Sequence, residues 1–151
     1  HPDHPRVADV LYQLGLSYIY QMLNVDQDQS ATIYALNAFQ TLKERFPEDR
    51  RMEEVQIYID RCLNQLASSE VQVGQFYLRT KSYAASINRL TGVLKKYPNY
   101  YQRDKAYYLL GQAYLMNGEK DEAVASFNTL FDDYVGSEYI LDAQRFIETN
   151  Y

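Results

Sequence analysis

The chain has 151 residues, enough for one domain with an ordinary core, and 46% hydrophobic and 23% charged residues are typical of a globular protein. With 15 Lys and Arg against 20 Asp and Glu, the net charge of −5 argues against nucleic-acid binding, which needs a basic surface. No apolar run approaches the roughly 20 residues that span a bilayer. The single cysteine, Cys62, excludes an internal disulfide.

Apolar residues recur at steps of three and four along the chain, and no segment alternates with a period of two for long enough to make a strand. We therefore predict an all-α protein. The predicted helices cover residues 5–23, 29–46, 51–79, 82–97, 102–117, 120–134 and 137–149. The third helix is unusually long. Its buried face is predicted to contain Val55, Ile59, Cys62, Leu66, Val73 and Tyr77.

Short polar residues and glycine mark the predicted helix ends. Asp28 or Ser30 is expected to begin the second helix, because a side-chain oxygen there accepts an unpaired backbone N–H. Ser82 and Ser137 are expected to do the same for the fourth and seventh helices. Gly118 supplies a turn residue that tolerates positive φ after the fifth helix. The short turns make consecutive helices antiparallel neighbours.

The residue spacing of the tetratricopeptide repeat occurs twice in full. One copy contains Tyr107, Leu110, Gly111, Tyr114, Ala123 and Phe127, with Val135 at the usual final proline. The other contains Leu14, Gly15, Tyr18, Ala35, Phe39 and Pro47, with eight residues inserted between its helices. Gly74, Tyr77 and Pro98 mark a weaker third copy.

In such a repeat, glycine and alanine let paired helices approach closely, and the aromatic residues fill the space beyond them. We therefore predict an α-solenoid of antiparallel helical hairpins within a single domain, residues 1–151. The predicted hairpins cover about residues 5–46, 51–97 and 102–134, and a final helix covers 137–149.

Further residues go beyond the generic repeat. The first group is His4-Pro5, Tyr12, Gly15-Leu16, Val25-Asp26-Gln27-Asp28-Gln29, Ala38-Phe39 and Phe46-Pro47. The second is Arg61, Leu66-Ala67, Glu70, Val73, Phe76-Tyr77, Tyr83, Ala85, Ile87-Asn88-Arg89 and Tyr97-Pro98. Together with the inserted loop and the long third helix, they make residues 4–118 resemble the BamD family of outer-membrane assembly lipoproteins.

The resemblance implies a subunit of the β-barrel assembly machinery, lipid-anchored at the periplasmic face of the outer membrane. It implies binding to BamA, to small partner lipoproteins and to unfolded outer-membrane protein segments. The family's lipidated cysteine and first repeat do not occur in this sequence, so we expect a piece of a longer chain. Residues Glu119 to Tyr134 continue as a good repeat, so the carboxyl end resembles the family only in part.

In repeats of this type, the first helix of each hairpin lines the concave face. Counted from the repeat glycines, this face is predicted to contain Asp9, Tyr12, Leu16, Tyr20, Gln75, Arg79, Lys105, Tyr108, Gln112 and Met116. Tyr, Met and Arg suit recognition of an extended or helical peptide. The alternative is that several of these residues only contact neighbouring repeats.

Glu70 occupies a position where the repeat normally has a large aromatic residue, between Leu66 and Val73. A half-buried carboxylate there needs a partner. Arg89, on the antiparallel fourth helix, lies near the right level, and both residues match the family pattern. Two interpretations stay open: an ion pair within the chain, or an Arg89 that faces BamA.

Asp26, Asp28 and Ser30 resemble the start of a calcium-binding loop. Ala31 replaces the glycine that such a loop requires at its sixth position, and Asn37 replaces the glutamate at its twelfth. Helix capping is therefore the better interpretation of this segment.

We predict neither a metal site, nor a cofactor, nor an active centre. His1 and His4 have no Cys or further His nearby. Cys62 lies on an apolar helix face, which predicts a buried, unreactive thiol. No catalytic triad, paired carboxylates or glycine-rich phosphate loop occurs in the sequence.

A tetratricopeptide adaptor or co-chaperone is the alternative function. Such an adaptor clamps a peptide carboxylate with Lys and Asn, and Tyr12 and Leu16 stand in their places here. The sequence therefore favours the non-catalytic assembly scaffold that the family resemblance implies.

Overall fold

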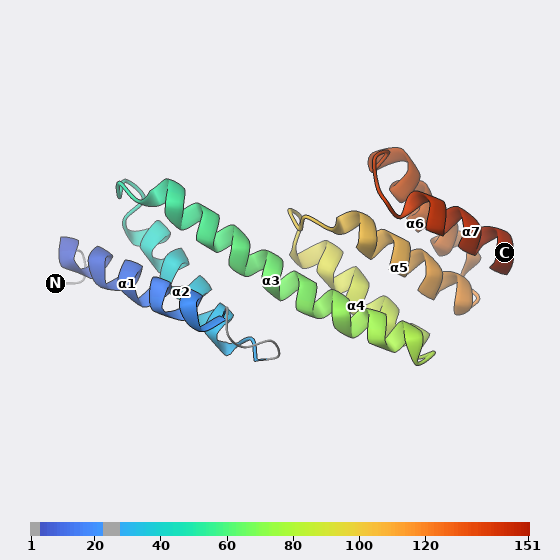
Figure 1. The fold of residues 1–151 in the computed structure, drawn as a ribbon, viewed down its shortest axis with the longest axis horizontal. Coiled ribbons are helices and arrows are strands. Elements are labelled where there is room, and N and C mark those ends of the chain that lie inside the picture. The colour runs from blue at the N-terminus through green and yellow to red at the C-terminus, as the bar shows by residue number, and fades with distance from the viewer. Residues whose placement is uncertain (1–3, 23–27) are drawn as a thin grey trace. The chain divides into compact units, whose positions relative to one another are not determined.

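The computed structural model describes residues 4–22 and 28–151, which form seven helices and no strand (Figure 1). The helices are α1 (Pro5–Met22), α2 (Ser30–Arg45), α3 (Met52–Arg79), α4 (Tyr83–Lys96), α5 (Arg103–Met116), α6 (Lys120–Asp133) and α7 (Ile140–Asn150). The predicted all-α class is confirmed. Every predicted boundary within the described ranges lies within one residue of the observed one, except the start of the last helix; the predicted end of the first helix, residue 23, lies outside these ranges. No helix in the described ranges is long and apolar enough to cross a membrane.

The chain forms two compact units, His1–Leu66 and Ala67–Tyr151. Helix α3 is continuous through the boundary, so its first half packs within the first unit and its second half within the second.

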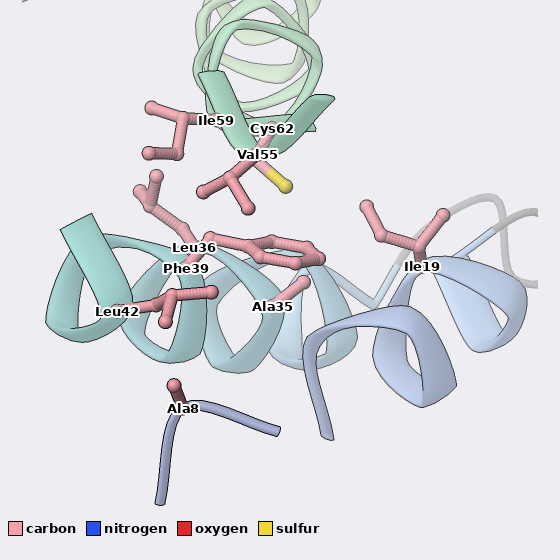
Figure 2. Packing of buried hydrophobic residues seen from close by; sticks show 9 residues of the cluster. All are labelled: Ala8, Ile19, Ala35, Leu36, Phe39, Leu42, Val55, Ile59 and Cys62. Atoms are coloured by element: carbon pink, nitrogen blue, oxygen red, sulfur yellow. The ribbon is translucent and has the colours of Figure 1, made fainter. Parts of the chain in front are cut away.

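The first unit is built around the ring of Phe39 on α2, which is fully buried. A Cβ atom on Gly15 of α1 would lie only 2.5 Å from this ring, so α1 approaches it through a residue without a side chain. From α3, the ring of Tyr58 stacks on Phe39 at a centroid distance of 5.1 Å. The buried apolar residues of this core are Ala8, Ile19, Ala35, Leu36, Phe39, Leu42, Val55, Ile59 and Cys62 (Figure 2).

The second unit repeats this packing. A Cβ atom on Gly111 of α5 would lie 2.6 Å from the ring of Phe127 on α6. In the weaker repeat copy, Gly74 of α3 faces Leu90 of α4, and the Ser86 hydroxyl donates to the Gly74 carbonyl oxygen at 2.7 Å. The close approach predicted for the repeat glycines is therefore present at all three of them.

The buried face of α3 differs from the prediction in its second half. Leu66, Val73 and Tyr77 are only partly buried, whereas Ala67, Val71 and Gly74 are buried. These residues follow one another at steps of four and three and so share one face of α3, on which Gly74 lets Leu90 of α4 approach closely. Packing against the following helix, and not the largest apolar side chains, therefore decides which face is covered.

Two helices end in the same left-handed turn. Gly118, after α5, has a φ of +81°, as the sequence predicts, and Lys81, after α3, has a φ of +64°. In both turns the N–H of the following residue bonds to a carbonyl of the preceding helix, at 2.9 and 2.8 Å. Lys81 thus occupies a conformation in which glycine is usual.

The capping predicted for two serines is wrong. Ser82 precedes α4, but its side chain makes no capping hydrogen bond. The Ser137 hydroxyl donates to Asp104 Oδ2 at 2.7 Å and accepts the N–H of Tyr139 at 3.1 Å. A hydrogen bond to a carboxylate is stronger than one to a neutral group, so Ser137 holds the turn before α7 to the start of α5.

Candidate functional site

Arg89 and Glu70 form an ion pair at the surface of the second unit. Glu70 lies on α3 and Arg89 on α4, and Arg89 Nη1 donates to Glu70 Oε2 at 2.9 Å. The carboxylate raises the pKa of Arg89 through this hydrogen bond. The side chain of Arg89 is 43% exposed and that of Glu70 is 41% exposed, so the pair is a solvated surface contact. Exposed pairs of this kind contribute about 0–1 kcal/mol to stability, so the loss of one partner costs far less than it would in a buried pair.

A polar hollow of about 250 Å³ opens beside this pair. It is lined by Glu70, Asn88, Arg89, Gly92, Val93, Lys96 and Tyr97. A Cβ atom on Gly92 would have nothing within 4 Å, so the middle of the hollow is open. Two cations against one carboxylate leave it locally positive, which suits an anionic side chain from outside.

In the first unit, the structure brings two other candidate residues together through Arg51. Arg51 Nη2 lies 3.0 Å from Asp9 Oδ1, and its guanidinium carbon lies 4.6 Å from the ring centre of Tyr12. The Tyr12 hydroxyl donates to Glu54 Oε1 at 2.6 Å, which raises the pKa of Tyr12 to about 12. The polar atoms of Asp9 and Tyr12 therefore join α1 to the start of α3.

Arg51 is itself held by Asp49. Its Nε and Nη2 donate to the two carboxylate oxygens at 2.9 and 3.0 Å, and the side chains are only 16% and 12% exposed. The hydrogen bond from Arg51 lowers the pKa of Asp49 to about 2. Sequence reasoning missed Arg51 because it occupies no position of the repeat pattern. For Glu54, the sequence contains one indication of a structural role: the residue lies in the first turn of a predicted helix, where carboxylates are favoured.

The remaining residues predicted for a concave face are described for each unit separately. In the first unit, Leu16 is partly buried and Tyr20 is 65% exposed. In the second unit, the Tyr108 ring stacks on Tyr139 at 5.4 Å, and Met116 is 43% exposed. Arg79 is exposed, whereas Gln75, Lys105 and Gln112 are partly buried. Tyr108 thus also contacts a neighbouring element, the alternative considered for this set.

The segment that resembles a calcium loop is described only from Asp28, because Asp26 lies outside the described residues. Asp28 Oδ1 accepts the N–H of Ser30, the first residue of α2, at 2.9 Å, and this hydrogen bonding lowers the pKa of Asp28. In residues 4–22 and 28–151, no three His, Cys, Asp or Glu side chains are grouped so that they could hold a metal ion. Cys62 is fully buried, and burial raises the pKa of its thiol to about 11.

Known proteins match this chain along its length. The family YfiO, described as outer membrane lipoprotein, matches residues 1–126. Outer membrane protein assembly factor BamD of Rickettsia prowazekii is 32% identical over 148 residues, which cover 98% of this chain and 59% of the relative. BamD of Caulobacter vibrioides is 28% identical, over 99% of this chain and 49% of the relative. For BamD of Neisseria meningitidis serogroup A, the identity is 24%, over 95% and 57%.

The chain spans about half the length of these curated relatives. The alignment with BamD of Rickettsia prowazekii includes both full repeat copies. It also includes the long helix α3, one of the features on which the sequence resemblance rests. On this coverage, the chain belongs to the YfiO or BamD family of outer-membrane lipoproteins.

Proposed function

We propose that this chain is part of a non-catalytic scaffold for β-barrel assembly at the periplasmic face of the outer membrane. Its partners would be BamA, other lipoproteins of the machinery and unfolded outer-membrane protein segments, and the full-length protein would be held by a lipid anchor. The observation that carries the proposal is family membership: three relatives named outer membrane protein assembly factors align over 95% or more of this chain.

The hollow beside Arg89 is the proposed contact with BamA. The Arg89 side chain is 43% exposed and uses Nη1 for Glu70, so a partner can approach its guanidinium from solvent. A guanidinium binds a carboxylate through two parallel hydrogen bonds, which adds orientation to affinity. A carboxylate of BamA would therefore bind Arg89 and compete with Glu70.

The exposed side chains of Tyr20, Arg79 and Met116 are the proposed contacts for unfolded protein segments, together with the partly buried polar residues of the same predicted face. Aromatic, Met and Arg side chains are enriched where peptides are bound. Asp9 and Tyr12 are weaker members of this set, because their polar atoms already bind Arg51 and Glu54.

The adaptor alternative is disfavoured by the surroundings of Tyr12. A carboxylate clamp needs donors at this position. Here the Tyr12 hydroxyl donates to Glu54, whose negative charge would repel a peptide carboxylate.

Co-purification tests the proposed function. Tagged protein, recovered from detergent-solubilised outer membranes, should bring BamA with it in a fixed ratio. Recovery without BamA, or with a cytosolic chaperone in its place, would contradict the proposal and favour the adaptor.

A further inference from the structure

The charges of the second unit are divided along the sequence. Residues 79–105 contain seven Lys or Arg and one Asp, whereas residues 119–151 contain eight Asp or Glu and only two Lys or Arg. The segment that holds α6 and α7 therefore has a net charge of −6, against −5 for the whole chain.

The carboxyl end of helix α6 contains acidic residues, where basic residues are usual. The last turns of α2 and α4 contain basic residues and no acidic pair, whereas the last turn of α6 contains Asp132 and Asp133 and no basic residue. Negative charge at a helix carboxyl end is unfavourable, because that end of the helix is itself negative. Within the described residues, no ion pair involves either aspartate. The fold alone does not compensate this charge.

An apolar hollow of about 200 Å³ lies between α6 and α7. Val124, Phe127 and Phe131 line it from α6, and Ile147 lines it from α7. Small-molecule pockets usually measure about 300–1,000 Å³, so this hollow is too small for one and suits a single large apolar side chain. Val124 is 39% exposed at its edge, so the hollow is reached from solvent.

Two carboxylates flank the hollow on α6. Asp121 lies three positions before Val124, and Asp132 lies four positions after Asn128, which also lines the hollow. Residues three and four apart are neighbours on a helix surface, so both aspartates lie beside residues that line the hollow. Both are exposed.

We infer that the α6–α7 hollow docks a basic amphipathic helix of a partner protein. One apolar side chain of that helix fills the hollow, and its Lys or Arg residues pair with Asp121 and Asp132, which also neutralises the carboxyl end of α6. A second copy of this chain is a poor occupant, because a symmetric contact would bring two segments of net charge −6 together. This surface is separate from the Arg89 hollow and does not depend on the contact proposed there.

A synthetic helix of leucine and lysine, roughly five turns long, is the probe. Its affinity for the purified protein should fall roughly tenfold in Val124→Asp, which fills the hollow with a polar group, and by a similar factor in Asp121→Lys/Asp132→Lys. Glu44→Lys/Glu48→Lys is the matched control: it changes the net charge equally on the exposed surface of the first unit and should leave the affinity within about twofold. Circular dichroism checks that every variant is folded.

Val124→Asp separates docking from general attraction of charges. It makes the segment more acidic, so a purely electrostatic association would become tighter, whereas loss of the apolar anchor makes it weaker. Unchanged or tighter binding to this variant overturns the inference, and so does equal binding of a leucine–glutamate helix. A dimer in sedimentation that Val124→Asp dissociates would also overturn it, by showing that a second copy occupies the hollow.

Discussion

The ring of Phe127 occupies the place that a side chain on Gly111 would need, since a Cβ atom there would lie 2.6 Å from Cε1. Phe127 is 3% exposed and packs in the core of α5, α6 and α7, so its ring has little room to move. The glycine of the repeat is therefore a packing requirement of the second unit.

Gly111→Ala should lower the free energy of unfolding by about 1 kcal/mol, the middle of a range of about 0–2 kcal/mol. Overpacking a core costs about 1–3 kcal/mol, and the better helix propensity of alanine offsets about 1 kcal/mol of this. Gly92→Ala is the control within α4, because a Cβ atom there meets nothing within 4 Å, and it should stabilise by about 0.5–1 kcal/mol. Urea midpoints that move in the same direction for both variants would contradict the packing described for Gly111.

Lys81→Gly should stabilise the protein by about 0.5–1 kcal/mol. Lys81 has a φ of +64°, a conformation that costs a residue with a Cβ about 1–2 kcal/mol, and the greater freedom of glycine in the unfolded chain offsets part of the gain. Gly118→Lys places the same strain in the equivalent turn and should destabilise by a similar amount. Thermal melting of the two variants checks both signs, and a lower melting temperature for Lys81→Gly would refute the argument.

Stability should fall in acid through Asp49. Its pKa lies near 2 in the folded protein against an ordinary 3.8, so the stabilisation is fully present above about pH 4 and is lost as the pH falls towards 2. The difference corresponds to about 2 kcal/mol. Urea unfolding of wild type and Asp49→Asn across this range is the measurement: the gap in free energy should be widest above pH 4 and close towards pH 2. A gap that is the same at both ends would show that Arg51 does not hold this carboxylate.

The sequence predicted the helices because the features that determine them are local. Repeat spacing places Gly15 against Phe39 and Gly111 against Phe127 without any knowledge of the fold. The same spacing, counted from Gly74, would also have assigned Ser86 to the interface of α3 and α4. The fixed offsets of a repeat are what makes such contacts predictable.

Polar contacts between side chains that are distant in the sequence were not predicted. Ser137 donates to the distant Asp104, and α7 begins only at Ile140, three residues after the predicted start; no periodicity signals either feature. The cluster of Arg51 with Asp9 and Asp49 likewise joins residues that share no pattern. For Glu70 and Arg89 the sequence left open an ion pair within the chain or an Arg89 that faces BamA; the structure contains the ion pair, and its exposure depends on how closely α4 packs on α3.

Arg89→Glu should change the free energy of unfolding by less than about 1 kcal/mol, because the pair with Glu70 is exposed to solvent. If the pair were buried, the same substitution would leave an unpaired charge in the interior and would cost several kcal/mol. Chemical denaturation of the variant provides the value. A loss of several kcal/mol would mean that the pair supports the packing of α4.

The most direct test of the proposed function is a titration of BamA with wild type, Arg89→Glu and Lys95→Glu. Lys95 is exposed on the same helix but does not line the Arg89 hollow. Lys95→Glu is therefore the matched control, because it reverses the same charge outside the hollow. The proposed contact predicts that Arg89→Glu weakens binding roughly 30-fold or more, because it sets two like charges together, while Lys95→Glu binds nearly as wild type. A folded Arg89→Glu variant that binds BamA as tightly as the wild type would contradict it.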